Sequence, residues 1–193
     1  MEGKPLATLR SASGVPTGRL AVWWVLASEV VIFGGLLGSY VMHRIGHPEW
    51  AGHEYAGATN PWIGLLNTFV LLSSSLTAVI AHHYAEKGQG KKAANFLFMT
   101  IGGAATFVVV KSFEWYTEIH HGFTITKNTF WSFYYTAAGI HALHVIAGAI
   151  LMGWVASYAR RNEELQRVEL IGIYWHFVDV VWIFLFPLLY IAK

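Results

Sequence analysis

The chain has 193 residues, of which 55% are hydrophobic, 16% aromatic and 12% charged, with a formal net charge of +2. It contains no cysteine, which excludes disulfides, thiolate metal sites and cysteine-bound clusters. The apolar residues come in long blocks, so little sequence remains for a soluble domain, and we expect no nucleic-acid partner.

A transmembrane helix needs roughly 20 mostly apolar residues to cross about 30 Å of hydrocarbon. We therefore predict an all-α membrane protein, a bundle of five transmembrane helices formed by residues 20–193. The residues before it, 1–19, are polar and lack the apolar core of a signal peptide, so the first span is expected to direct its own insertion. The predicted spans are about 20–43, 62–83, 94–117, 129–158 and 170–191.

Segments rich in basic residues alternate with segments poor in them along the chain. This alternation is what five spans require, because each span carries the chain to the opposite side of the membrane. The basic residues concentrate before the first span and in the second and fourth connections, at Lys4, Arg10, Arg19, Lys87, Lys91, Lys92, Arg160, Arg161 and Arg167. Because cytoplasmic loops carry an excess of Lys and Arg, we predict a cytoplasmic N-terminus and a C-terminus on the periplasmic or outer side. The charged segment 160–169 is also compatible with a continuation of the fourth helix.

Small residues recur on three of the spans. They are Gly34, Gly35 and Gly38, residues 102–105, and Gly139, Gly148 and Gly153. Small residues let helices approach closely in lipid, where apolar bulk alone gives no driving force. We expect tight helix packing at these positions.

Glu29 is the most informative polar residue of the first span. It lies nine residues past Leu20, roughly 14 Å along a helix at about 1.5 Å per residue. An ionisable group at such depth costs about 2.5–3.5 kcal/mol or more unless it is partnered, so we expect it to be protonated or hydrogen-bonded by another helix. Two interpretations stay open: a group that handles protons, and an interhelical hydrogen bond.

Other polar side chains fall inside the second and third spans. Lys111 and Glu114 are three residues apart and share a helix face, which predicts a structural ion pair, and Glu118 extends that face by another turn. Asn67, Thr68 and residues 73–75 are expected to form interhelical hydrogen bonds.

Histidines in the last two spans raise the question of a metal or haem. His141 and His144 share a helix face, and Asp179 follows His176 at a spacing that suits a carboxylate orienting a ligand. The adjacent pairs at 82–83 and 120–121 point about 100° apart and form no bidentate site. We predict no bound metal or haem. Instead, we expect the histidines to be bonded to carboxyls of other helices or to lipid phosphates. A small haem-binding membrane cytochrome remains the alternative of another class.

Five motifs in order resemble the cytochrome c oxidase subunit III family. They are WVLASEVVIF from Trp24, LNT from Leu66, FEWY from Phe113, GIHALHV from Gly139 and YWHFVDVVW from Tyr174. The chain resembles the short five-helix bacterial form, because the first two helices of larger members have no counterpart. Ser75 and Ala142 stand where the family usually has glycine, and Ile140 replaces the common phenylalanine.

The resemblance implies a non-catalytic subunit of a haem–copper terminal oxidase in the aerobic respiratory chain. Its expected partners are the catalytic subunit I and the copper-binding subunit II, which hold the haems and copper, together with structural phospholipid. Membership of a respiratory supercomplex is also compatible with the resemblance. The expected location is a bacterial inner membrane, where the subunit would support proton uptake and complex stability. A quinol oxidase, or an accessory subunit of nitric oxide reductase, is the alternative within the family. Glu29 favours the cytochrome c branch, because quinol oxidase relatives often carry Asp there.

The resemblance also assigns site residues. Glu29 matches the family's carbodiimide-reactive glutamate, expected to relate to proton uptake. Structural roles are implied for an intramembrane polar cluster made of Asn67, Glu114, His141, His144, His176 and Asp179. The candidates for lipid-phosphate contact are His83, Arg160 and Arg161. No catalytic or metal-ligating residue is expected.

Overall fold

The computed structural model describes residues 14–47 and 59–192, and within these ranges it contains helices and no strand. Each of five helices is long and apolar enough to cross a membrane, which confirms the predicted number and order of spans. Most of the N-terminal segment 1–19 lies outside the described residues. The helices are α1 (Thr17–Gly46), α3 (Pro61–Glu86), α4 (Gly90–His120), α5 (Thr129–Ala159) and α6 (Gln166–Phe186), the last continued by a π-helical turn (Pro187–Ile191).

Two helix starts follow directly from the sequence. Asn60 accepts a hydrogen bond from the backbone N–H of Trp62 at 3.0 Å, with Pro61 at the first helical position. Asn128 accepts one in the same way from the N–H of Trp131, also at 3.0 Å. Past these caps the sequence is apolar, and a helix satisfies its backbone internally as lipid requires.

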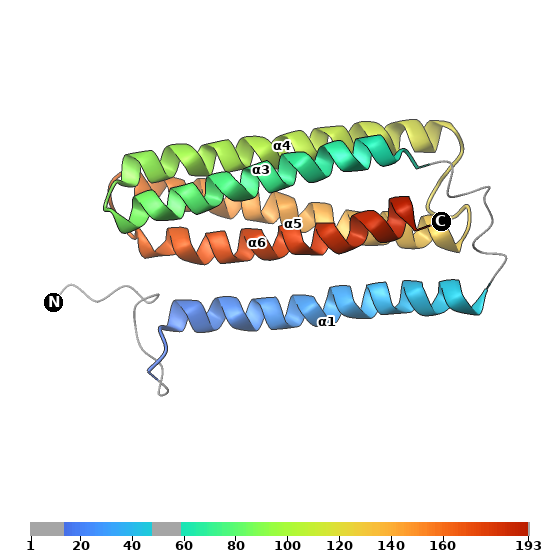
Figure 1. Ribbon diagram of the computed structural model, residues 1–193, viewed down its shortest axis with the longest axis horizontal. Helices are drawn as coiled ribbons and strands as arrows, with labels where there is room; N and C mark the ends of the chain where they lie inside the picture. The colour runs from blue at the N-terminus through green and yellow to red at the C-terminus, as the bar shows by residue number, and fades with distance from the viewer. Residues whose placement is uncertain (1–13, 48–58, 193) are drawn as a thin grey trace.

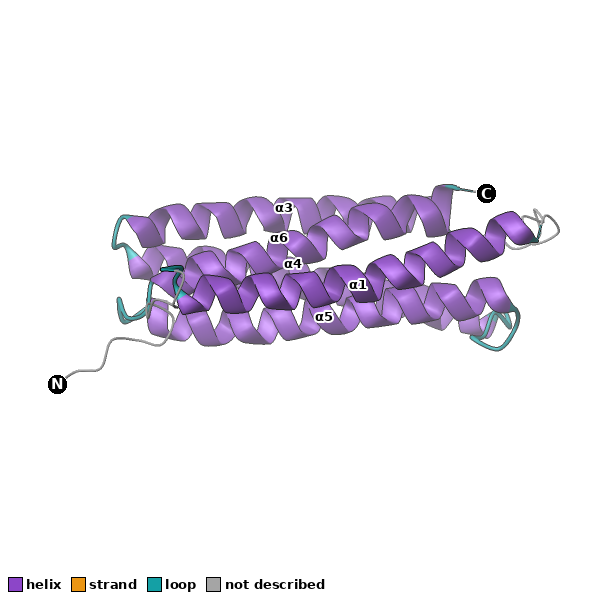
Figure 2. Ribbon diagram, turned by 90° about the horizontal axis from the view of Figure 1, so that it is seen from below, coloured by secondary structure: helices purple, strands orange, loops and turns teal. Residues whose placement is uncertain are grey.

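Helices α3, α4, α5 and α6 form a four-helix bundle, and α1 lies along one side of it against α6 and α5 (Figures 1 and 2). One end of the bundle carries the α3–α4 and α5–α6 turns and the start of α1, and we call it the N-terminal end. The opposite end carries the α4–α5 connection and the end of the described chain, and we call it the C-terminal end. Because α6 touches α1, α3 and α5, it joins α1 to the bundle.

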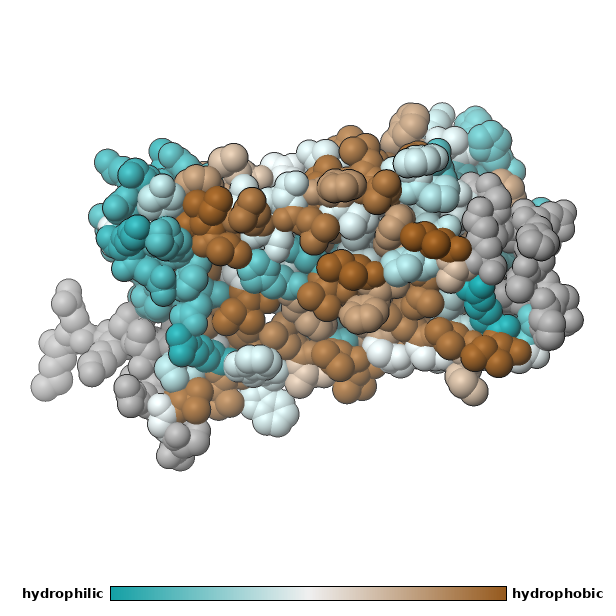
Figure 3. All heavy atoms as spheres, viewed as in Figure 1, coloured by the Kyte–Doolittle hydropathy of each residue, from teal (hydrophilic) through white to brown (hydrophobic). Residues whose placement is uncertain are grey.

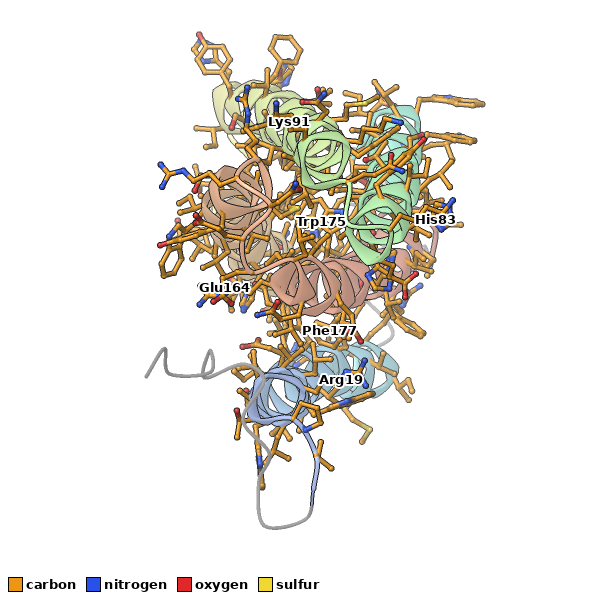
Figure 4. All side chains as sticks on the ribbon, turned by 90° about the vertical axis from the view of Figure 1, so that its left-hand side faces the viewer. Arg19, His83, Lys91, Glu164, Trp175 and Phe177 are labelled. Carbon is orange, nitrogen blue, oxygen red and sulfur yellow. The ribbon has the colours of Figure 1, made fainter. Side chains whose placement is uncertain are left out.

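The core of the bundle contains glycines that neighbouring helices approach closely. A Cβ on Gly148 would lie 3.1 Å from a ring carbon of Trp175, and one on Gly103 would lie 2.6 Å from the Cβ of Ser74. Trp175 sits among the four helices, whereas Phe177 lies on the side of α6 that faces α1 (Figure 4). The expected tight packing therefore holds at Gly103 and Gly148, whereas Gly102 faces open space and a Cβ on Gly139 or Gly153 would make an ordinary contact with an atom 3.9 Å away.

The glycines of α1 behave differently. A Cβ on any of Gly34, Gly35 or Gly38 would meet nothing within 4 Å. The expectation of close packing was wrong for this helix, because it contacts the bundle along one face and these glycines lie elsewhere. The rest of its surface is largely apolar and exposed, with Trp24 72% exposed and Val31 74% exposed.

Apolar side chains cover the middle of the molecule and polar ones gather at the N-terminal end (Figure 3). An apolar surface this extensive belongs in contact with lipid or with other membrane proteins. Polar side chains also occur at the C-terminal end (Figure 3), and an apolar middle between two polar ends agrees with a chain that spans the bilayer.

The charged segment after α5 turns back and does not extend the helix, in contrast to one reading of the sequence. Helix α5 ends at Ala159, and Asn162 and Glu164 adopt positive φ angles of 58° and 51°. The side-chain oxygen of Asn162 accepts a hydrogen bond from the backbone N–H of Gly90 at 2.8 Å. Asparagine tolerates this left-handed conformation, and its side chain links the turn to the start of α4.

Candidate functional site

Glu29 faces His144 across the interface between α1 and α5. Its Oε2 atom lies 3.0 Å from His144 Nε2, at ion-pair distance, although the contact lacks the alignment of a hydrogen bond. His144 Nδ1 lies 2.8 Å from the carbonyl oxygen of Ile140, one turn earlier. That contact places a ring proton on Nδ1, so Nε2 is the ring nitrogen that faces the Glu29 carboxyl.

A groove runs from this pair toward the N-terminal end, between α1, α5 and α6. Its volume is about 530 Å³. Most of its lining is apolar, and the ionisable side chains that line it include the Glu29–His144 pair, Arg167 and Tyr174. Tyr174 donates a hydrogen bond to the carbonyl oxygen of His144 at 3.3 Å, which joins α6 to the same site. The groove is of a size and character that suits a hydrocarbon ligand.

Polar contacts hold α1 to the bundle beyond this pair. Arg19 pairs with Glu169 at 2.6 Å near the N-terminal end. Near the C-terminal end the hydroxyl of Tyr40 donates to the carbonyl oxygen of Leu188 at 3.1 Å, and Arg44 donates to the carbonyl oxygen of Ala192. The position of Glu29 relative to His144 therefore depends on contacts along the whole length of α1.

A second polar site is buried toward the C-terminal end. Lys111 Nζ donates to Glu114 Oε2 at 3.0 Å, which confirms the predicted ion pair. It also donates to the hydroxyl oxygens of Tyr134, at 2.7 Å, and of Tyr190. Tyr134 donates in turn to Glu118 Oε1 at 2.9 Å, so the two carboxyls and the ammonium belong to one network.

The predicted intramembrane polar cluster does not form a single site. Glu114 belongs to the Lys111 network and His144 to the α1 interface, whereas His176 Nδ1 lies 2.6 Å from the hydroxyl of Ser75 on α3. Asp179 is buried and lies near that same hydroxyl, although outside the geometry of a hydrogen bond.

The remaining two members of the predicted cluster are fully buried. The ring of His141 lies between aromatic side chains, 5.4 Å from the ring of Phe107 and 5.2 Å from that of Trp182. Asn67 is also 0% exposed. Neither side chain has a hydrogen-bond partner among the described residues. Their placement does not direct them toward a common ligand.

The three candidates for phosphate contact are exposed. His83 points outward from the end of α3 (Figure 4), and Arg160 and Arg161 follow the end of α5. All three lie toward the N-terminal end, where polar side chains gather. Within residues 14–47 and 59–192, no group of three or more His, Asp or Glu side chains is arranged to hold a metal ion.

The family model described as cytochrome c oxidase subunit III matches residues 9–193. The chain belongs to this family. As a subunit III of a haem–copper oxidase, it is a multi-pass membrane protein that associates with other oxidase subunits, and the cofactors of such oxidases sit in those other subunits.

Similar proteins carry names from more than one oxidase type. The cytochrome c oxidase subunit 3 of Corynebacterium diphtheriae is 33% identical, over 87% of this chain and 84% of its own length. A probable quinol oxidase subunit 3 of Staphylococcus saprophyticus is 30% identical, over 89% and 87%. A heme-copper oxidase subunit I+III of Aeropyrum pernix is 29% identical over 90% of this chain, which covers 22% of that protein.

Sequence reasoning identified both polar sites of this subunit III but missed most of their partners. The i, i+3 spacing indicated the Lys111–Glu114 pair, whereas nothing local indicated Tyr134 or Tyr190. The pairing of Glu29 with His144 joins residues in the first and fourth spans, and no signal within either span specifies it.

Proposed function

We propose that this chain is the non-catalytic subunit III of a bacterial terminal oxidase of the cytochrome c branch, and that Glu29 supports proton uptake by the complex. The observation that carries the proposal is the contact of Glu29 with His144 at the edge of an apolar groove. Carboxyl and imidazole side chains are common proton donors and acceptors in proteins.

The position of Glu29 supports this role. It lies 12 residues after the start of α1, about 18 Å along the helix, and its side chain is 13% exposed. A carboxyl at this depth is costly unless it is paired or protonated, so its presence suggests a function that repays the cost. With a cytoplasmic N-terminus, as predicted from the basic residues, Glu29 would lie in the half of the membrane from which protons are taken up.

We also propose that the groove holds an acyl chain of a structural phospholipid. Its lining is apolar along α1, α5 and α6, and Arg167 stands at its N-terminal part. Arg160, Arg161 and His83 remain the proposed contacts for lipid phosphates at this end of the molecule. Extraction and mass spectrometry of lipids from the purified oxidase test this, with Ala147→Trp as a variant that fills the groove. Equal phospholipid content in the wild type and the variant would contradict the proposal.

The role of Glu29 is tested with Glu29→Ala in the purified oxidase. We expect the variant complex to assemble, to take up protons more slowly and to lose activity sooner during turnover. Ser28→Ala is the matched control, because Ser28 is exposed and its hydroxyl bonds only to the carbonyl oxygen of Val25 in its own helix. Unchanged proton uptake together with an unchanged rate of inactivation in Glu29→Ala would exclude this role.

The identity of the complex is tested by purification of the tagged chain from its native membrane in mild detergent. We expect a catalytic subunit I and a copper-binding subunit II to accompany it. The fusion named subunit I+III in A. pernix supports contact with a subunit I. A subunit II without a cytochrome c site would favour a quinol oxidase, and a nitric oxide reductase partner would favour the accessory role. A haem spectrum from the isolated chain would instead favour a small cytochrome.

A further inference from the structure

The buried network at the C-terminal end contains more acid than base. One ammonium, on Lys111, faces two carboxyls, on Glu114 and Glu118, and the three residues are 1%, 2% and 5% exposed. The other titratable groups that face Glu118 among the described residues are the phenols of Tyr134 and Tyr135 on α5, with Tyr190 of the C-terminal π-helical turn beyond them. Within residues 14–47 and 59–192, no second cation enters this network.

The contacts of Lys111 are those of a charged ammonium. Its three N–H donors meet three acceptors, on Glu114, Tyr134 and Tyr190. Its Nζ atom also lies 4.4 Å from the ring centroid of Tyr134 and 5.0 Å from that of Tyr190, within the range of cation–π attraction. A neutral amine would have one donor fewer and would leave one of these acceptors without a partner.

Glu114 is the counter-ion of this ammonium. Its Oε2 atom accepts hydrogen bonds from Lys111 at 3.0 Å and from the hydroxyl of Tyr190 at 3.0 Å. Two donors on one oxygen, one of them charged, stabilise the ionised carboxylate. The single positive charge of the network is therefore balanced by Glu114.

Glu118 is left without a counter-ion. It reaches Lys111 only through the hydroxyl of Tyr134, which donates to its Oε1 atom at 2.9 Å. Its Oε2 atom lies 3.5 Å from the hydroxyl of Tyr135, whose proton is engaged by the carbonyl oxygen of Phe123 at 2.7 Å. The oxygen of Tyr135 is thus free to accept a hydrogen bond from a protonated Oε2. A second buried negative charge here would be uncompensated and costly.

We propose that the Lys111–Glu114–Glu118 network is a proton-binding site, in which Glu118 holds one proton that exchanges with water at the C-terminal end of the bundle. The step is the addition of one proton from water to the Glu118 carboxylate and its later return, with no other bond made or broken. Glu118 is suited to this exchange because it lies two residues from the end of α4 and retains 5% exposure, whereas Lys111 lies two turns deeper. The site is separate from the Glu29–His144 pair and does not depend on the function proposed for that pair.

The experiment is infrared spectroscopy of the purified oxidase that contains the full chain, in H2O and in D2O. We expect Glu118→Gln to remove one C=O stretching band of a protonated carboxylic acid, and we expect this band in the wild type to shift in D2O. Glu86→Gln is the control, because Glu86 is an exposed carboxyl of α3 that pairs with His82 among the described residues, and it should remove no such band. A carboxylic-acid region that is identical in Glu118→Gln and the wild type would overturn the proposal.

Two further readouts keep the test decisive. If the band is present but does not shift after prolonged incubation in D2O, the proton does not exchange and the proposal is wrong in that respect. If Glu118→Gln does not assemble, Tyr134→Phe keeps the carboxyl and removes its donor to Oε1. The band should then remain and move in frequency, and an unmoved band would show that the protonated acid is not Glu118.

Discussion

The Lys111–Glu114 ion pair of the buried network leads to a prediction about two destabilising substitutions. When they are combined, their effects on the free energy of unfolding should partly cancel. Lys111→Met removes the ammonium and leaves the Glu114 carboxylate among apolar and phenolic groups with one donor, Tyr190. Breaking a buried pair by removal of one partner costs about 3–5 kcal/mol, because the other charge stays buried and uncompensated. Glu114→Leu should destabilise the protein by a similar amount, because it leaves the ammonium without its counter-ion.

The double variant Lys111→Met/Glu114→Leu should be more stable than either single variant. Both charges are then absent, and the two phenols keep partners: their hydroxyl oxygens are 3.2 Å apart, and Tyr134 still donates to Glu118. Replacement of a whole buried pair by apolar residues is often neutral or stabilising. We expect the loss in free energy of unfolding of the double variant to be smaller than the sum of the two single losses by at least about 3 kcal/mol. This difference is at the upper end of coupling energies between neighbouring residues.

The assay is unfolding of the detergent-solubilised chain by SDS, followed through tryptophan fluorescence, with the free energy of unfolding compared across the four proteins of the cycle. Tyr116→Phe is a suitable control, because Tyr116 is on the same helix and 64% exposed. Additive losses in the double variant would refute the reasoning, since they would mean that Lys111 and Glu114 stabilise the bundle independently.

Further predictions concern packing and the turn after α5, and thermal unfolding of the purified protein checks them. Gly103→Ala should destabilise the bundle by about 1–3 kcal/mol, because its Cβ would lie 2.6 Å from that of Ser74. Gly102→Ala has open space and should be neutral or stabilising by up to about 1 kcal/mol through helix propensity. The reverse order would contradict the packing described for α3 and α4. Asn162→Ala should cost about 1–2 kcal/mol, since it loses the bond to Gly90 and strains a positive φ. A loss as large in Asn162→Gly would show that the strain contributes little.

The number, order and approximate limits of the helices could be predicted from the sequence because lipid imposes a simple rule. A chain in hydrocarbon must satisfy its backbone within each helix, so long apolar blocks have essentially one conformation available. The ends were less predictable. The turn at Asn162 depends on a hydrogen bond to Gly90, on another helix, and the charged composition of the segment gives no sign of it.

The candidate site could be predicted only where its chemistry is local. Lys111 and Glu114 lie one helical turn apart, so their contact follows from the geometry of a single helix. The contacts of Glu29 with His144 and of His176 with Ser75 depend on which faces of separate helices meet, and hydropathy does not encode that choice. The glycines of α1 illustrate the same limit, since a small residue permits close packing but does not specify a neighbour.

The completion of the Lys111 network by Tyr190 has a consequence for biosynthesis. Lys111 enters the membrane with the third span, but Tyr190, which both accepts from its ammonium and donates to Glu114, lies in the last turn of the fifth. Until Tyr190 has emerged from the ribosome, the Lys111–Glu114 pair of the nascent protein lacks part of its hydrogen bonding. Charged groups with incomplete hydrogen bonding in hydrocarbon raise the free energy of the partly inserted chain. A truncation just before this tyrosine would therefore expose the defect to quality-control proteases, even though it leaves the first four spans and most of the fifth.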